Sequence, residues 1–298
     1  MAVIFGLAAC GGKNDANGSP SASASPSSSA SEPASPSASE PASSSASEPA
    51  SPSASTASSA SAAPSAEAVE LTVSAAASLT DALGELKTLY ETAHPEVTLS
   101  FNFGASGALQ QQIEQGAPAD LFLSASSKNM QALVDKGLMQ EQHNLLKNEL
   151  VVVVPSDGGT AVAKLEDLSD AAVKKVAVGI PESVPAGGYA KDALTAAGLW
   201  DSLQAKLVQG KDVRQVLQFV ETANADAGFV YKTDALSSDK VKIAFAVDPS
   251  QYKSIVYPIG IIKATKHADA AGSFYAYLQT PEAIAVFVKY GFSAAAAA

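Results

Sequence analysis

The sequence predicts an α/β protein of two lobes with a ligand cleft between them. From residue 71 to residue 293, strand-like segments alternate with helix-like segments, which implies parallel sheets with helices on both faces. The run Leu150–Val154 is continuously apolar, as is typical of a strand covered on both faces in a parallel sheet. The chain leaves the first series of elements near Leu150 and returns near Tyr257. We therefore expect a cleft between the lobes, at the carboxyl ends of the strands.

The first series of elements is expected before the apolar run. Apolar residues three and four positions apart from Leu79 to Ala93 predict a helix with one buried face. The full set is a strand at 71–74, a helix at 79–93, a strand at 97–103, a helix stopped by Gly116 and Pro118, a strand at 120–123 and a helix ended by Gly137.

The second series follows the apolar run. Asp212 is expected to cap a helix, because the apolar residues from Val213 to Val220 then share one face. Pro281 suits the first position of a helix. The full set is a strand at 175–180, a turn at 184–188, a helix at 189–197, a helix from Val213, strands at 227–231, 241–247 and 255–262, and helices at 268–278 and 281–289.

Ser78 lies where the first strand runs into its helix, after the small residues Ala75–Ala77. In one interpretation Ser78 caps its own helix, because Ser78 and Asp81 have the spacing of a capping box. In the other, the unpaired N–H groups of the first helical turn form an anion site at the end of the strand. The pattern alone favours capping. Similar strand-to-helix junctions recur along the chain, however, at Ser106 and Val213, and this recurrence favours the anion site.

Residues 17–66 have a composition unlike that of the rest of the chain. Nearly every residue is Ser, Ala or Pro, and Ser-Glu-Pro-Ala-Ser recurs every eight residues from position 31. Without large apolar residues such a segment cannot offset the entropy lost on ordering. We therefore assign a disordered tether to 11–68, lobe I to 69–149 plus 256–293, lobe II to 150–255 and a disordered tail to 294–298.

The charge balance is acidic. The formal net charge is −11, of which −7 belongs to the part after Ala68, and Arg214 is the only arginine. This balance argues against nucleic acid and anionic membrane surfaces as partners, and an anion would have to be bound by local dipoles. The three histidines, His94, His143 and His267, lack the spacing of metal ligands and are expected at the surface.

Residues 1–10 resemble part of a lipoprotein signal. Leu7-Ala8-Ala9-Cys10 is similar to a bacterial lipobox, whose Cys becomes the lipidated first residue of the mature protein. The segment before it is short and lacks a basic region, so we expect the start to be internal to a longer signal sequence. The protein would then be anchored by lipid in the cell envelope, on the periplasmic or extracytoplasmic side. In the alternative interpretation Cys10 is an ordinary thiol in a disordered tail.

The junctions, taken in order, resemble the periplasmic molybdate-binding proteins of ABC transporters. That family has the two-lobed type II periplasmic-binding-protein fold, and the match covers about 71–293. The motifs that carry the resemblance are Ala75–Leu79, Gly116–Phe122, Val184–Gly187, Asp212–Arg214, Val230–Tyr231 and Lys289–Phe292.

The resemblance implies a site and a set of partners. The oxyanion would be held by the hydroxyls of Ser78 and Ser106, the N–H groups of Ala186 and Val213, and the hydroxyl of Tyr231. The ligand would be molybdate or tungstate, with no cofactor and no catalysis. Partners would be an ABC permease with its ATPase, and the membrane only through the lipid anchor. We expect a monomer.

Other classes of function have some support. A sulfate-type binding protein would share the fold. A serine hydrolase is suggested by Gly104–Gly107, which is close to a nucleophile elbow around Ser106, with Asp248 and His267 further along the chain. A structural or adhesive role would leave the clustered donors at the strand ends unexplained.

Overall fold

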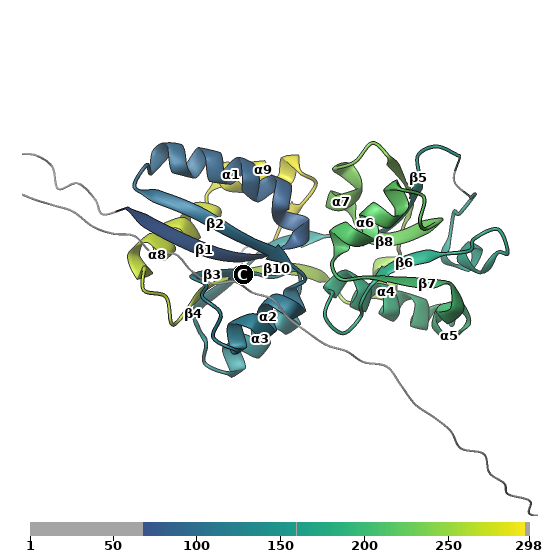
Figure 1. The fold of residues 1–298 in the computed structure, drawn as a ribbon, viewed down its shortest axis with the longest axis horizontal. Helices are drawn as coiled ribbons and strands as arrows, with labels where there is room; N and C mark the ends of the chain where they lie inside the picture. The colour runs from purple at the N-terminus through teal and green to yellow at the C-terminus, as the bar shows by residue number, and fades with distance from the viewer. Residues whose placement is uncertain (1–67, 159, 296–298) are drawn as a thin grey trace, which may run out of the picture. The chain divides into compact units, whose positions relative to one another are not determined.

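A computed structural model of the chain describes residues 68–158 and 160–295. These residues belong to one compact unit and form two sheets, each with its own helices (Figure 1). We call the part built on the six-stranded sheet the first lobe and the part built on the five-stranded sheet the second lobe. The lipobox-like segment, Cys10 and nearly all of the expected tether lie outside the described residues.

The first lobe contains both ends of the described chain. Its elements are β1 (Val69–Ala76), the 3₁₀ turn η1 (Ala77–Leu79), α1 (Thr80–Ala93), β2 (Val97–Gly104), α2 (Ser106–Glu114), β3 (Leu121–Leu123), α3 (Ser127–Asp135), β4 (Met139–Asn148), β10 (Ile255–Ile262), α8 (Ala268–Leu278), α9 (Pro281–Lys289) and β11 (Ser293–Ala294). Strand order in the sheet is β11-β4-β10-β3-β1-β2.

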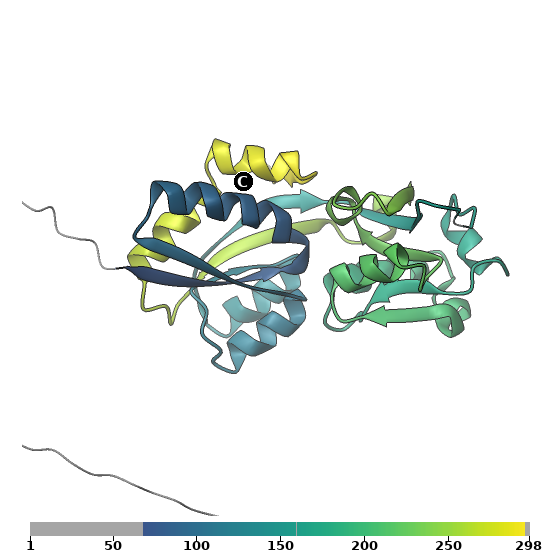
Figure 2. The same ribbon diagram turned by 45° about the horizontal axis from the view of Figure 1, so that its top comes forward.

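Helices cover both faces of this sheet, with α1 and α9 on one side and α2 and α3 on the other (Figure 1, Figure 2). The alternation of side chains along β3 explains why both faces are apolar. Phe122 packs with Leu109 and Met130 of α2 and α3, whereas its neighbours Leu121 and Leu123 belong to the larger core. A strand with apolar residues on both faces is thus covered on both.

The second lobe is one continuous stretch of chain. Its elements are β5 (Leu150–Pro155), η2 (Leu165–Ser169), β6 (Val176–Gly179), α4 (Pro185–Ala196), α5 (Trp200–Leu203), η3 (Gln204–Lys206), β7 (Leu207–Gly210), α6 (Val213–Glu221), β8 (Ala227–Tyr231), α7 (Lys232–Leu236), β9 (Val241–Ala246) and η4 (Pro249–Gln251). Strand order is β7-β6-β8-β5-β9.

The α/β class and the two lobes agree with the sequence prediction, but the sheets, which were predicted to be parallel, are mixed. Strand β10 is antiparallel to β3 and β4, and β5 is antiparallel to β8 and β9. Both strands follow a crossing between the two sheets: β5 follows β4 after Glu149 alone, and β10 follows β9 through the 3₁₀ turn η4, so neither crossing contains an α-helix that reverses the chain direction. The apolar run Leu150–Val154 correctly indicated a strand buried on both faces. A mixed sheet buries a strand in this way as well, so the run does not indicate strand direction.

Other elements also differ from expectation. Helix α4 begins at Pro185, so the expected turn at 184–188 contains its first turn. Proline suits the first helical position, and Gly187 is needed there because a side chain would overlap the Gly179 carbonyl oxygen of β6. Strand β4 was not predicted, since its exposed polar residues lack a clear alternation.

At the C-terminal end, the strand β11 includes Ala294, which the sequence assigned to the tail. Ser293 and Ala294 pair with Lys147 and Leu146 of β4, and the Ala295 N–H donates to the Leu145 carbonyl oxygen. Ordered backbone pairing therefore extends two residues beyond the expected boundary at 293.

Candidate functional site

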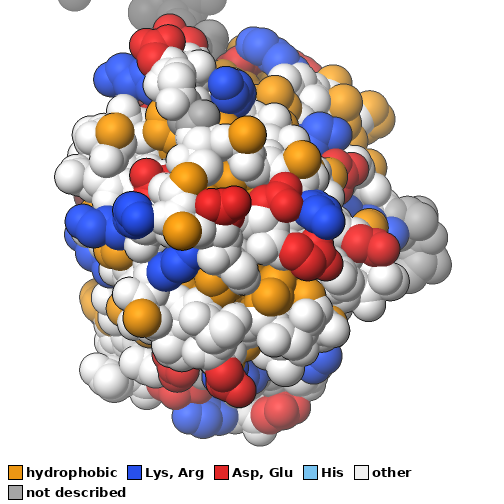
Figure 3. All heavy atoms as spheres, turned by 90° about the vertical axis from the view of Figure 1, so that its right-hand side faces the viewer, with side chains coloured by type: hydrophobic (Ala, Val, Ile, Leu, Met, Phe, Trp, Pro, Cys, Tyr) orange, Lys and Arg blue, Asp and Glu red, His pale blue; other side chains and the backbone are white. Residues whose placement is uncertain are grey.

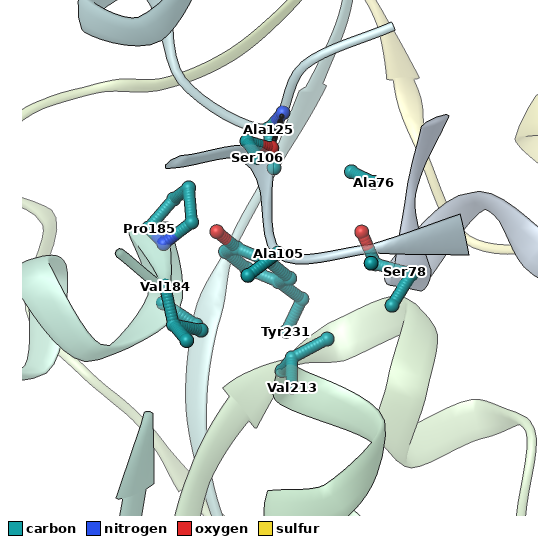
Figure 4. A pocket seen from close by; sticks show the side chains of 12 residues that line it. Ala76, Ser78, Ala105, Ser106, Ala125, Val184, Pro185, Val213 and Tyr231 are labelled. Carbon is teal, nitrogen blue, oxygen red and sulfur yellow. Dashed lines mark hydrogen bonds between the residues drawn. The ribbon is translucent and has the colours of Figure 1, made fainter. Parts of the chain in front are cut away.

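A small cavity of about 10 Å³ lies between the two lobes, and the five sequence-predicted site residues all line it (Figure 4). The lining residues are Ala76, Ala77, Ser78, Gly104, Ala105, Ser106, Ala125, Val184, Pro185, Ala186, Val213 and Tyr231.

Ser78 does not cap its helix, so the alternative interpretation of Ser78 and Asp81 as a capping box is wrong. The turn η1 intervenes between β1 and α1, which places Leu79 at the N-cap position of α1, without a side-chain cap. The Ser78 hydroxyl instead lies 2.8 Å from the hydroxyl of Tyr257. Ser78 is buried, and its side chain reaches the cavity wall (Figure 4).

Ser106 is the first residue of α2 and is completely buried. Its hydroxyl oxygen accepts a hydrogen bond of 2.9 Å from the Ala125 N–H, which leaves its own proton available for another acceptor. The sequence-predicted junction after β2 therefore places a hydroxyl donor at a helix start.

Ala186 and Val213 contribute backbone N–H groups at the starts of α4 and α6. Val213 is the first residue of α6, and Ala186 follows Pro185, the first residue of α4. N–H groups in these positions have no acceptor within their own helix. Asp212 caps α6 as predicted, because its carboxylate accepts from the Gln215 N–H at 2.8 Å. The cap leaves the Val213 N–H available.

The Tyr231 hydroxyl is buried and has no hydrogen-bond partner among the described residues. Tyr231 ends strand β8, and its ring meets the ring of Tyr257 edge to face, with the centroids 5.8 Å apart. Burial raises the pKa of Tyr231 well above its ordinary value, so the phenol stays protonated. An unpaired buried donor is costly, and a ligand acceptor in the cavity would remove that cost.

No lining residue of the cavity is charged. The nearby Arg214 is held elsewhere: its Nη2 lies 2.6 Å from Asp81 Oδ2 and its Nε lies 2.9 Å from Asp234 Oδ1. The second of these is an ion pair without hydrogen-bond geometry. The positive ends of the helices that begin at the cavity are therefore a source of positive potential for an anion there.

The pair formed by Arg214 and Asp81 joins the lobes, because Asp81 is in α1 and Arg214 is in α6. Both side chains are partly exposed, so the pair contributes about 1 kcal/mol or less. Further hydrogen bonds between the lobes include those from the Gly107 N–H to the Ser183 carbonyl oxygen at 2.9 Å, from Asn148 Nδ2 to Thr233 Oγ1 at 3.0 Å, and from the Tyr189 hydroxyl to the Ala125 carbonyl oxygen at 3.5 Å.

Away from the cavity, charges of both signs are mixed. On the face at the end of the second lobe, acidic and basic side chains are interspersed with scattered apolar ones (Figure 3). Within 68–158 and 160–295, no group of three or more His, Cys, Asp or Glu residues could hold a metal ion. No helix in the same ranges has the length and apolar character needed to cross a bilayer.

The residues of the hydrolase alternative are not brought together. Ser106 lines the cavity, whereas Asp248 caps η4 and His267 lies in a different surface hollow beside Tyr90. His267 is exposed as predicted, but His94 and His143 are half-buried, and His94 stacks on the Tyr90 ring. The Ser, Asp and His required for a triad are therefore not assembled.

Two residues behind the cavity were not predicted from the sequence. Tyr257 in β10 is buried against Ser78, and Asn148 at the end of β4 donates to the Tyr257 hydroxyl at 3.3 Å. The only signal in the sequence was a tyrosine at a strand position that faces the core, between Ile255 and Ile259.

The fold and the cavity define a class, the two-lobed solute-binding proteins. Residues 71–293 match the family of bacterial extracellular solute-binding proteins, and the chain belongs to this family. The resemblance seen in the sequence motifs is thereby confirmed.

Individual relatives cover most of the described chain. A Bacillus subtilis (strain 168) protein provisionally named as an ABC transporter substrate-binding lipoprotein, YvgL, is 52% identical over 228 residues, which are 76% of this chain and 87% of the relative. The Haemophilus influenzae molybdate-binding protein ModA is 41% identical over 230 residues, which are 76% of this chain and 90% of the relative.

Solved structures agree on the fold. The substrate-binding domain of a Clostridium difficile protein, provisionally named as a molybdenum ABC transporter, superposes with a TM-score of 0.59 at 44% identity, over 75% of this chain and 98% of that domain. The periplasmic molybdate-binding protein of Azotobacter vinelandii superposes with a TM-score of 0.69 at 24% identity, over 74% of this chain and 98% of that protein, and supports the fold alone.

We predict a pH-dependent stability that arises from Asp234. Complete burial raises its pKa to about 6 from an ordinary value of 3.8, although the Arg214 guanidinium acts in the opposite direction. A group whose pKa is raised on folding contributes stability below its unfolded pKa and loses it as the pH rises through its folded pKa. The free energy of unfolding of the wild type should therefore fall, relative to Asp234→Asn, by up to roughly 3 kcal/mol between those two values.

Urea unfolding of both proteins from acidic to neutral pH measures this difference, whatever the absolute stability of the variant. Parallel pH profiles for the two proteins would show that Asp234 titrates as it does in the unfolded chain.

Proposed function

We propose that this protein binds molybdate, and tungstate as well, in the cavity between its lobes and delivers the oxyanion to an ABC permease with its ATPase. It acts as a binding protein and not as an enzyme. The observation that carries the proposal is the convergence of hydrogen-bond donors on a small cavity whose lining residues are all uncharged. Relatives named as molybdate-binding proteins, which align along most of their length, support the choice of ligand.

The proposed ligand contacts come from both lobes. Ser78 and Ser106 donate from the first lobe, and the Ala186 and Val213 N–H groups and the Tyr231 hydroxyl donate from the second. Neither set surrounds an anion by itself, so closure of the lobes completes the site. The positive ends of α2, α4 and α6 add favourable electrostatic potential without a counter-ion.

The donor set also sets selectivity. A fully deprotonated tetrahedral dianion accepts from every donor, whereas hydrogen phosphate carries a proton that needs an acceptor. No carboxylate lines the cavity, so that proton would be buried without a partner, at a cost of roughly 1 to 3 kcal/mol. Sulfate carries no proton and is discriminated only by its shorter bonds, which prevent its oxygens from meeting every donor at about 2.7 to 3.0 Å.

We predict that molybdate and tungstate bind tightly at neutral pH, and that phosphate and sulfate compete poorly. Competition calorimetry with the four anions measures this order. Displacement of molybdate by phosphate at comparable concentration would contradict a donor-only site. Displacement by sulfate would instead favour the alternative function, a sulfate-type binding protein, which has the same fold.

We predict that Tyr231→Phe weakens molybdate binding by roughly 1.5 to 3 kcal/mol, because it removes one hydrogen bond to a charged ligand. Tyr277→Phe is the matched control: its hydroxyl is also buried without a partner, but it lies in α8 and does not line the cavity. Calorimetry on both variants tests the role. Equal affinities for Tyr231→Phe and the wild type would make Tyr231 a core aromatic only.

We further propose that the protein is a monomer held at the extracytoplasmic side of the cell envelope by lipid on Cys10. The lipobox-like Leu7–Cys10 and the lipoprotein named among the relatives support this. Protein expressed behind a full native signal should carry the mass of a lipidated Cys10, and Cys10→Ala should remove it. An intact mass without lipid in the first protein would contradict the anchor.

A further inference from the structure

A chain of hydrogen bonds lies behind Ser78, outside the cavity. The Glu149 N–H donates to Asn148 Oδ1 at 2.9 Å, and Asn148 Nδ2 donates to Thr233 Oγ1 at 3.0 Å and to the Tyr257 hydroxyl at 3.3 Å. The Tyr257 hydroxyl in turn lies 2.8 Å from Ser78 Oγ. Tyr257 is buried and does not line the cavity, so it meets the ligand only through Ser78.

The chemistry of these groups determines which atom donates in each of these hydrogen bonds. A backbone N–H can only donate, so the Asn148 atom that faces Glu149 is the oxygen, and the amide nitrogen faces Tyr257. The Tyr257 oxygen therefore accepts from Asn148. Among the described residues, Ser78 is the only other hydrogen-bond partner of the Tyr257 hydroxyl, so a satisfied Tyr257 proton has to be donated to Ser78 Oγ. Because Ser78 Oγ accepts from Tyr257, its own proton is directed away from Tyr257.

Ser106 is held in the same way by a different group. Its oxygen accepts from the Ala125 N–H at 2.9 Å. Both serines thus accept a hydrogen bond from another group of the protein, and each has one proton left to donate to a ligand in the cavity. The two hydroxyls have been made donors by their surroundings, although a free serine hydroxyl can either donate or accept.

We propose that Tyr257, oriented by Asn148, is a positioning residue that holds Ser78 as a hydrogen-bond donor and thereby excludes protonated oxyanions. The proposal rests on the proposed function, because it assigns the selectivity of that same site. Without the Tyr257 hydroxyl, Ser78 can rotate and accept the proton of hydrogen phosphate. The discrimination against phosphate then weakens more than the affinity for proton-free anions does.

The first experiment compares Tyr257→Phe with the wild type and with Tyr231→Phe. Dissociation constants for molybdate, sulfate and phosphate are measured at mildly alkaline pH, where inorganic phosphate is chiefly a dianion with one proton. Sulfate is the proton-free reference of equal charge. Tyr257→Phe should lower the ratio of the phosphate to the sulfate dissociation constant by about tenfold. Tyr231→Phe, which removes a donor from every anion, should leave that ratio within about twofold.

Asn148→Asp is the second variant, and it keeps the shape of the side chain. A carboxylate only accepts, so Tyr257 would donate to it and Ser78 would donate to Tyr257. The phosphate to sulfate ratio should fall again, while the added charge weakens both dianions alike. This variant keeps the proposal testable if Tyr257→Phe does not fold.

A double-mutant cycle distinguishes an effect of Tyr257 through Ser78 from a general disturbance of the structure. In a Ser78→Ala background, Tyr257→Phe should have no further effect on the ratio, because the group it orients is gone. An unchanged ratio in both Tyr257→Phe and Asn148→Asp, or additive effects with Ser78→Ala, would overturn the proposal. Wild-type protein that does not bind molybdate would contradict the proposed function instead, and any tetrahedral dianion that it does bind serves for the same comparison.

Discussion

The starts of four helical segments meet at one small cavity, and the rest of the fold depends on this convergence. The segments are the turn η1 leading into α1, and the helices α2, α4 and α6. Helix starts repel one another electrostatically and carry N–H groups that need acceptors, so their meeting is unfavourable unless something between them is negative. Two separate sheets deliver the segments from opposite sides. We regard the two-lobed architecture as the means of bringing four such ends together.

The chain keeps its single arginine out of the cavity. Arg214 is the second residue of α6, next to the proposed ligand residue Val213, yet its guanidinium lies against Asp234 and Asp81. A charged side chain in the cavity would attract anions of any protonation state, whereas fixed N–H and O–H donors distinguish a bare dianion from a protonated one. The buried acid beside Arg214 is thus part of what keeps the site neutral.

The proposed ligand donors also link the two lobes, because they come from both of them. Contacts between the lobes beyond the cavity include one partly exposed ion pair and hydrogen bonds from Gly107 and Tyr189. Gly107 has to be glycine, because a side chain would meet the Ser183 carbonyl of the other lobe. The proposed ligand would accept hydrogen bonds from both lobes, which would couple ligand binding to lobe closure.

Local sequence alone determined much of this protein. The strand at 255–262 and the helices at 268–278 and 281–289 have the predicted bounds, because strong periodicity and Pro281 are local signals. The capping of α6 by Asp212 is equally local. Motif positions also named five residues that the structure gathers in one cavity. The direction of β5 and β10 and the partners of Ser78 and Arg214 were decided only by tertiary structure. Ser78 contacts Tyr257, which is 179 positions away in the sequence, and Arg214 contacts Asp81, which is 133 positions away. Contacts between residues so far apart cannot be inferred from the periodicity of either segment, because that periodicity reflects only local structure.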